Sequence, residues 1–194
     1  MDWLLDLDTR LFLAINGWHS TGWDGIMWWI SGKVTWWPFY LIVLIYLGVT
    51  RKWELIAMVL ILAATITLTD QTSVHLFKNV FQRLRPCHEP ALEGLVHLVN
   101  NKCGGEYGFI SSHAANAFGV AVLITGWTRR WFIFLLMTTW ALLVGYSRVY
   151  LGVHYPGDVM AGALWGAACG WVMLSLYRWL KTRMPAQWKR YVVH

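Results

Sequence analysis

The chain has 194 residues, of which 57% are hydrophobic and 13% are charged. Soluble domains carry about a quarter charged residues, so this composition excludes an ordinary soluble protein and indicates a membrane protein. The net charge is +6, but the sequence has no basic stripe in which aromatic residues are interleaved. We therefore expect no nucleic-acid partner, and we assign the excess charge to loops that orient the chain in a bilayer.

Residues 1–33 do not form a uniform apolar segment. Asp2, Asp6 and Asp8 stand where the first region of a cleavable signal peptide is basic, so we expect no such signal. Glycines and polar side chains interrupt the apolar residues between positions 16 and 25, and tryptophans recur along the segment. This pattern predicts interfacial helices with their tryptophans in the headgroup layer.

We predict that residues 34–177 form a transmembrane catalytic core. A helix needs about 20 apolar residues to cross the hydrocarbon, with tolerance for tilt and local thinning. We predict a single-domain, all-α membrane bundle of five spans, with six as the alternative if the N-terminal segment also crosses. The five apolar stretches run over residues 34–50, 53–76, 112–127, 130–146 and 157–177.

Basic clusters predict the orientation. With five spans, Arg51-Lys52, Arg129-Arg130 and the basic tail 178–194 share one side, which the positive-inside rule makes cytoplasmic. The opposite side receives the loop 78–111 and the connection 147–156. Orientation alone would exclude cations from that side, so we interpret the basic residues found there as a phosphate site: Lys78, Arg83, Arg85, Lys102 and Arg148.

The first candidate segment closes the second span. Lys78 and Arg85 are seven residues apart, which on a helix places them on one face about two turns from each other. Pro86 ends the helix directly after Arg85. The alternative is a pair of snorkelling cations that cap the span.

The second segment, Ser111-Ser112-His113, precedes the third span. Either serine can cap a helix whose free N–H groups bind an anion. His113 would lie at the same end, where it could protonate an oxygen that leaves a bound phosphate. The alternative is a plain N-cap.

The third segment surrounds the start of the last span. Pro156 suits the first turn of a helix, which places His154 before the helix and Asp158 one turn inside it. The carboxylate can accept a proton from one imidazole nitrogen, and the other nitrogen is then free to attack phosphorus. The alternative is an ordinary pair of capping residues.

Together the segments read Lys-x6-Arg-Pro, Ser-x-His and Ser-Arg-x5-His-x3-Asp. This pattern resembles the type 2 phosphatidic acid phosphatase (PAP2) superfamily, which includes membrane lipid phosphatases and soluble vanadium haloperoxidases. The resemblance covers residues 34–177 and implies metal-independent hydrolysis of a lipid phosphate or diphosphate with no cofactor. Haloperoxidase chemistry is disfavoured because an apolar five-span body suits a lipid substrate.

The resemblance also implies residue roles. His154 is similar to the family's nucleophile, which forms a phosphohistidine; Asp158 is similar to its orienting partner and His113 to its general acid. Ile110 and Ser112 depart from the proline and glycine of the family's Pro-Ser-Gly-His motif, and the Ser112 hydroxyl could replace the backbone contact that glycine allows. The matched positions that resemble the phosphate site are Lys78, Arg85, Arg148, Ser111 and Ser112.

The outer loop carries two cysteines, Cys87 and Cys103, in what this topology makes oxidising space. We predict a disulfide between them, with two unpaired thiols as the alternative, and a short amphipathic helix over 92–99. Together with His88 and His97 they fit no standard zinc spacing, so no metal site is predicted. In the second span, we expect Asp70, Gln71 and His75 to face the bundle.

The short chain and outward site suggest a bacterial cytoplasmic membrane enzyme whose site faces the periplasm or cell exterior. Three lipids fit: undecaprenyl diphosphate, which we favour, phosphatidylglycerol phosphate and lipid A 1-phosphate. A non-enzymatic lipid scaffold or transporter on the same fold is the remaining class. Loss of His154, His113 or an arginine would favour it, and none is lost. The oligomeric state is left open.

Overall fold

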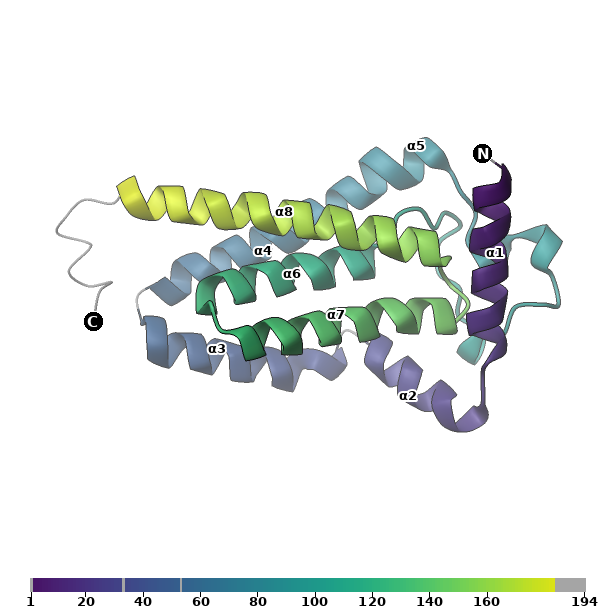
Figure 1. The fold of residues 1–194 in the computed structure, drawn as a ribbon, viewed down its shortest axis with the longest axis horizontal. Helices are drawn as coiled ribbons and strands as arrows, with labels where there is room; N and C mark the ends of the chain where they lie inside the picture. The colour runs from purple at the N-terminus through teal and green to yellow at the C-terminus, as the bar shows by residue number, and fades with distance from the viewer. Residues whose placement is uncertain (1, 33, 53, 184–194) are drawn as a thin grey trace.

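The computed structural model describes residues 2–32, 34–52 and 54–183, so the predicted tail beyond residue 183 lies outside the described residues. The described chain is an all-α bundle, as predicted. Figure 1 shows its long helices side by side along one axis. They are α3 (Trp37–Arg51), α4 (Glu54–Thr72), α6 (Ser112–Thr128), α7 (Trp131–Tyr150) and α8 (Pro156–Arg183).

Within the described part of the chain, four helical segments are long and apolar enough to cross a membrane: Val34–Arg51, Glu54–Phe81, Trp131–Tyr150 and Pro156–Arg183. The fifth bundle helix, α6, has 17 residues and packs against α4, α7 and α8. Leu41, Ile42 and Ile45 on α3 are more than half exposed. Because the bundle presents large apolar side chains outward, these faces contact lipid.

The contact between α6 and α8 is the most extensive between described helices, and small residues allow it. A Cβ added to Gly166 would lie 2.0 Å from the carbonyl oxygen of Ala115, and one added to Gly170 would lie 2.7 Å from that of Gly119. Glycine spacing of this kind lets two membrane helices approach until their backbones touch. The tight contact places the first turns of α6 and α8, which carry His113 and Asp158, at one end of the bundle.

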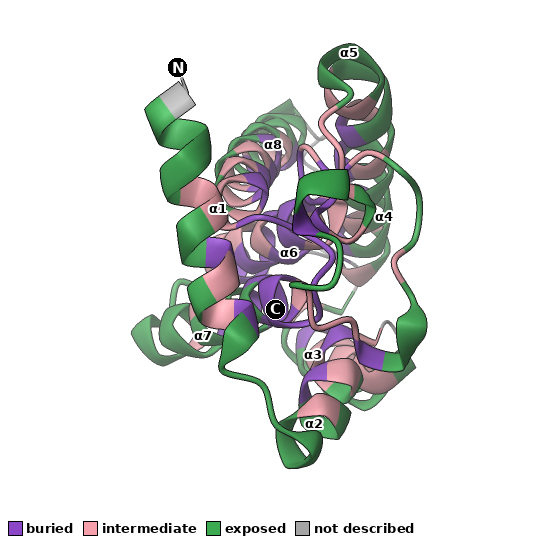
Figure 2. Ribbon diagram, turned by 90° about the vertical axis from the view of Figure 1, so that its right-hand side faces the viewer, coloured by how far each residue is buried: buried purple, intermediate pink, exposed green. Residues whose placement is uncertain are grey.

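The N-terminal segment forms two separate helices, α1 (Asp2–Gly17) and α2 (Thr21–Ser31), as predicted. Neither is among the four candidate spans, and α1 crosses the end of the bundle (Figures 1 and 2). Asp8 of α1 accepts a hydrogen bond from the backbone N–H of Gly157 at 2.7 Å. Asn16 donates to the carbonyl oxygen of Tyr150 at 2.7 Å. These bonds fix α1 to the ends of α7 and α8.

The second span continues beyond α4 as a π-helix, Ser73–Lys78, and a short helix, α5 (Asn79–Phe81). The chain then forms a small ladder, in which the N–H of Arg85 donates to Glu106 at 3.0 Å and that of Gly108 to Arg83 at 2.8 Å. A disulfide joins Cys87 to Cys103 beside this ladder. The helix predicted over 92–99 does not form; 3-10 turns at Pro90–Leu92 and Val99–Asn101 flank an irregular segment.

Candidate active site

The three candidate segments meet at one end of the bundle and line one cavity of about 260 Å³. Lys78 ends the π-helix after α4, Ser112 and His113 begin α6, and Arg148 and His154 lie in the last turn of α7 and in the loop before α8. The prediction that Lys78 and Arg85 share one helix, which Pro86 ends, is wrong: the helix ends at Phe81, and Arg85 lies in an extended stretch beyond it. Folding therefore gathers cations that are up to 70 positions apart in the chain, from Lys78 to Arg148. The lining residues are Asp70, Gln71, Val74, Lys78, Arg85, Ser112, His113, Asn116, Arg148 and His154.

His154 and Asp158 form a buried pair. Nδ1 of His154 lies 3.4 Å from Oδ2 of Asp158, and that oxygen also accepts the backbone N–H of Tyr155 at 3.0 Å. If Nδ1 carries the ring proton toward the carboxylate, Nε2 keeps its lone pair. Nε2 lies 3.3 Å from Nη1 of Arg85, so the free nitrogen faces the cations.

The pKa of His154 is lowered well below its ordinary value, chiefly by burial and further by the positive charges of Arg85, Arg148 and Lys78. Burial penalises the charged imidazolium, and neighbouring cations act in the same direction. The imidazole is therefore neutral near pH 7, which is the protonation state that a nitrogen nucleophile requires.

Two of the cations have a side-chain N–H group without an acceptor. Nε of Arg85 and Nε of Arg148 are buried and have no acceptor among the described residues. Lys78 donates from Nζ to the hydroxyl of Ser112 at 2.7 Å, and Nη1 of Arg148 donates to the hydroxyl of Ser31. Buried guanidinium N–H groups without an acceptor are costly, so the arrangement suits an incoming anion.

Ser111 does not take the place expected for a phosphate contact. It is the N-cap of α6, with its hydroxyl accepting from the N–H of Ala114 and its own N–H donating to the carbonyl of Asp158. It is fully buried and is not among the residues that line the cavity. Its part is to join the start of α6 to the start of α8, whereas Ser112 reaches the cavity.

The sequence did not predict two contacts that support the site. Arg83, interpreted above as one of the cations of a phosphate site, instead pairs with two carboxylates. Arg83 donates from Nη1 to Oδ1 of Asp158 at 2.9 Å and from Nη2 to Oδ2 of Asp8 at 2.7 Å. Its guanidinium also lies over the ring of Tyr155, 4.0 Å from the centroid. Arg83 had a signal in the sequence, because it is one of the basic residues on the outer side. Asp8 had none, because its partners lie 75 and 149 positions away.

The polar residues of the second span fall into two groups, those that line the cavity and one that does not. Asp70 and Gln71 line the cavity, as expected, and Oδ1 of Asp70 accepts from Nδ2 of Asn116 at 3.1 Å. His75 was expected to face the bundle, but this is wrong, because its side chain is exposed. The π-helix that begins at Ser73 turns the chain out of the register of α4 at this point.

Among the described residues, one group of three potential metal ligands is found, formed by Cys87, His88 and Cys103. The two sulfurs are bonded to each other, so they offer no thiolate to a metal. This group also lies outside the cavity that holds the cations.

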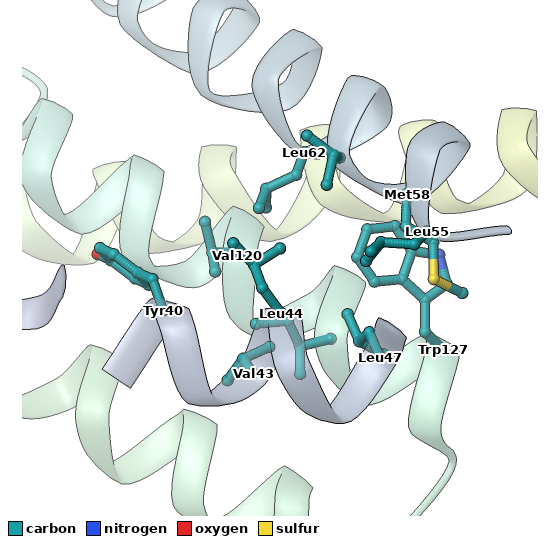
Figure 3. A pocket seen from close by; sticks show the side chains of 11 residues that line it. Tyr40, Val43, Leu44, Leu47, Leu55, Met58, Leu62, Val120 and Trp127 are labelled. Carbon is teal, nitrogen blue, oxygen red and sulfur yellow. The ribbon is translucent and has the colours of Figure 1, made fainter. Parts of the chain in front are cut away.

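A separate pocket lies between α3, α4 and α6 (Figure 3). Its walls are aliphatic and aromatic, from Tyr40 at one end to Trp127 at the other. It contains no ionisable side chain apart from the phenol of Tyr40, and none of the cations described above reaches it.

Comparison with known proteins gives consistent matches. Residues 53–182 match the model of the PAP2 superfamily. The chain is 38% identical to a lipid A 4'-phosphatase of Bacteroides thetaiotaomicron over 96% of this chain and 84% of that protein. It is 30% identical to a putative undecaprenyl-diphosphatase of Escherichia coli over 84% of this chain and 79% of that one. A crystal structure of Aquifex aeolicus LpxE superposes with a TM-score of 0.65 at 26% identity, over 87% and 95% of the two chains.

Proposed function

Because the chain belongs to the PAP2 superfamily and is a lipid phosphatase of the membrane, we propose that it releases phosphate through a covalent intermediate on His154. This proposal rests on one observation: the two nitrogens of the buried His154 ring have different surroundings. Nδ1 faces the carboxylate of Asp158, and Nε2 faces the cavity of Lys78, Arg85 and Arg148.

The substrate phosphate binds among the three cations. Its oxygens accept from the unpartnered N–H groups of Arg85 and Arg148 and from the ammonium of Lys78, with the hydroxyl of Ser112 beside them. Guanidinium–phosphate contacts are charge-assisted and directional, so they hold the phosphorus in line with Nε2. The same charges stabilise the equatorial oxygens of the transition state, the task that a metal ion performs in many phosphoryl-transfer enzymes.

In the first step, Nε2 of His154 attacks phosphorus and the bond from phosphorus to the lipid oxygen breaks. His113 donates a proton to that oxygen, and the lipid leaves as an alcohol. Asp158 accepts the Nδ1–H of His154 and stabilises the positive charge that develops on the ring. The product is a phosphohistidine.

In the second step, water attacks phosphorus and the phosphorus–nitrogen bond breaks. His113, now neutral, takes the proton from water, so the same side chain acts as acid and then as base. Inorganic phosphate leaves and His154 regains its free Nε2. Protons and charges balance over the two steps with no cofactor.

For the physiological substrate we propose a lipid A phosphate. The relative named as a lipid A 4'-phosphatase matches over nearly the whole chain at 38% identity, which supports this class above the undecaprenyl diphosphate that the sequence alone favoured. Undecaprenyl diphosphate stays the second candidate, supported by the Escherichia coli relative at 30% identity.

We place the protein in the bacterial cytoplasmic membrane with its site on the outer side. The opposite end of the bundle gathers Arg51, Arg129, Arg178 and Lys181 around one cavity. Arg51 caps the end of α6 by donating to the carbonyl of Trp127 at 2.8 Å. This cationic end suits the cytoplasmic, anionic leaflet.

Phosphate release from a panel of pure lipids tests the proposal. The wild-type protein and His154→Ala are each incubated with lipid A, undecaprenyl diphosphate and phosphatidylglycerol phosphate. The products are identified by mass spectrometry. We expect lipid A to lose one phosphate with the wild type and none with the variant. Equal turnover by His154→Ala would overturn the mechanism, and release from undecaprenyl diphosphate alone would overturn the substrate.

A further inference from the structure

A second cavity adjoins the phosphate-binding cavity at the general acid. Asp70, His113 and Asn116 line both of them, so the two spaces meet at these three side chains. In an in-line displacement the leaving group departs on the side opposite the nucleophile, and His113 must be within reach of its oxygen. Since His154 lines only the first cavity, the second one receives the leaving group.

The walls of this leaving-group cavity are aromatic. Trp36, just before α3, and Trp37 and Tyr40 in its first turn line it together with Trp140 of α7. Trp36 and Trp140 pack edge-to-face, with ring centroids 5.8 Å apart, so these rings form one continuous wall. Flat aromatic faces suit a ring with C–H groups on its surface, and Trp and Tyr offer a polar edge beside the apolar face.

Polar groups belong to several of the residues that line this cavity. The indole N–H of Trp140 is buried and has no acceptor among the described residues. Asp70 accepts from Asn116 through Oδ1, so a carboxylate and an amide stand side by side on the wall. Donors and acceptors of this kind lose hydrogen bonds if a purely apolar chain fills the space, so they disfavour a polyprenyl group.

Beyond the aromatic walls the space becomes apolar. Tyr40 and Val120 line both the leaving-group cavity and the aliphatic pocket between α3, α4 and α6 (Figure 3). The order along the bundle is therefore a cationic cavity, a cavity with aromatic walls and polar groups, and an apolar pocket. This order matches a molecule in which phosphate, a hydroxylated ring and an acyl chain follow one another.

We propose that the cavity lined by Trp36, Trp37, Tyr40, Trp140, Asp70 and Asn116 binds a sugar ring, so that the preferred substrate is the phosphate monoester of an acylated sugar. The proposal rests on the proposed function and adds the site that selects the substrate. The sugar stacks on the aromatic wall, its hydroxyl groups pair with Asp70 and the indole N–H of Trp140, and its ester oxygen lies at His113.

Two variants test the site without touching the cations or either histidine. Trp140→Phe keeps an aromatic ring and removes the indole N–H, while Trp37→Leu removes a ring that is 69% exposed at the start of α3. As a matched control, Trp165→Phe loses an indole N–H that donates to Thr72 at 2.8 Å and lines none of the three cavities. The substrates are an acylated glucosamine phosphate and a phosphatidic acid with the same acyl chains.

For the wild type we expect a higher kcat/KM with the glucosamine phosphate than with phosphatidic acid. Trp140→Phe should lower kcat/KM for the sugar substrate by about 3–10-fold, the effect of one lost hydrogen bond, and leave phosphatidic acid unchanged. Trp37→Leu should show the same selectivity, so misfolding of one variant leaves the other informative. The control should change neither substrate.

Equal losses on both substrates, or no loss on either, would overturn the sugar site, as would a wild-type preference for phosphatidic acid. The first two outcomes leave the proposed function intact, because phosphate is still released through His154. A preference for phosphatidic acid would also overturn lipid A as the substrate, but not the mechanism. Failure of the wild type to hydrolyse any lipid phosphate would instead overturn the proposed function, so the two failures are distinguishable.

Discussion

The guanidinium of Arg83 donates to Oδ1 of Asp158 at 2.9 Å, on the oxygen that does not face His154. Asp158 is fully buried and would lose its charge in an apolar site, but Arg83 supplies the compensating cation. The carboxylate is thus held by one oxygen while the other orients the nucleophile. Arg83 acts on the reaction through Asp158, as a positioning residue.

Arg83→Gln should lower kcat by about 10–100-fold with little change in KM, since a hydrogen bond to a charged group is worth about 1.5–3 kcal/mol. Arg83→Lys should restore part of the loss. Steady-state kinetics separate the effect on kcat from the effect on KM. Arg10→Gln is the matched control, because Arg10 pairs with Asp6 on the exposed face of α1, away from the site. A raised KM at unchanged kcat would mean that Arg83 binds the substrate directly.

His113→Ala should damage substrates in proportion to how poorly their leaving group departs. A lipid alkoxide needs a proton, whereas p-nitrophenolate does not, so we expect a loss of about 10²–10⁴-fold for the lipid monoester and a much smaller one for p-nitrophenyl phosphate. Chemical-step rates are compared by single-turnover kinetics. Equal losses on both substrates would contradict the role of general acid, and phosphate trapped on His113 would reverse the assignment of the two histidines.

Phosphate release should persist in EDTA. Lys78, Arg85 and Arg148 supply the positive charge around the transferring group, so chelation removes nothing that the reaction uses. Initial rates are measured before and after exhaustive chelation, with a metal-dependent phosphatase treated in parallel. Activity lost in EDTA and restored by one divalent ion would refute the metal-free mechanism.

The stability of the protein should fall as the pH drops below about 6.5, because the folded state holds His154 neutral. Burial, followed by the cations, lowers the folded pKa, so the unfolded chain binds a proton first as the pH falls. Full stability is present above the unfolded pKa, and about 1.4 kcal/mol is lost between pH 7.5 and 5.5. Thermal unfolding of the detergent-solubilised protein measures this loss.

His154→Gln should show a smaller drop in Tm over the same pH interval, and His75→Gln, which changes an exposed histidine, should match the wild type. An identical drop in the wild type and in His154→Gln would mean that other groups carry the pH dependence.

The orientation predicts which end is accessible from outside. In a background without the native cysteines, Lys102→Cys should react with an impermeant thiol reagent in intact cells, and Arg130→Cys should react only after lysis. Both positions are exposed, at opposite ends of the bundle, so accessibility differs only by side. The reverse labelling pattern would invert the topology, and retained phosphatase activity verifies that the background folds.

Whether a contact could be predicted from the sequence depends on how far apart its two residues lie along the chain. His154 and Asp158 are four residues apart, so local geometry brings them together. Lys78 and Arg85 both reach the cavity, but they do not share a helix face as predicted, because the helix ends at Phe81 and Arg85 has extended backbone. The pairing of Arg83 with Asp8 needs the final fold, since no periodicity links residues so far apart. His75 was misplaced because a π-helix breaks the period on which the prediction relied. The leaving-group cavity was missed because Trp140 and Asn116 look like ordinary span residues in a chain with 15 tryptophans.

Asp8 has one further consequence. The match to the superfamily begins at residue 53, yet the carboxylate of Asp8 pairs with Arg83 and accepts the N–H of Gly157 at the start of α8. The start of the match to the superfamily model is therefore not the start of the catalytic unit. A fragment cut to the matched region would keep every residue of the three motifs but lose the anion on the far side of Arg83. The crossing helix α1 belongs to the enzyme's architecture as much as the three motifs do.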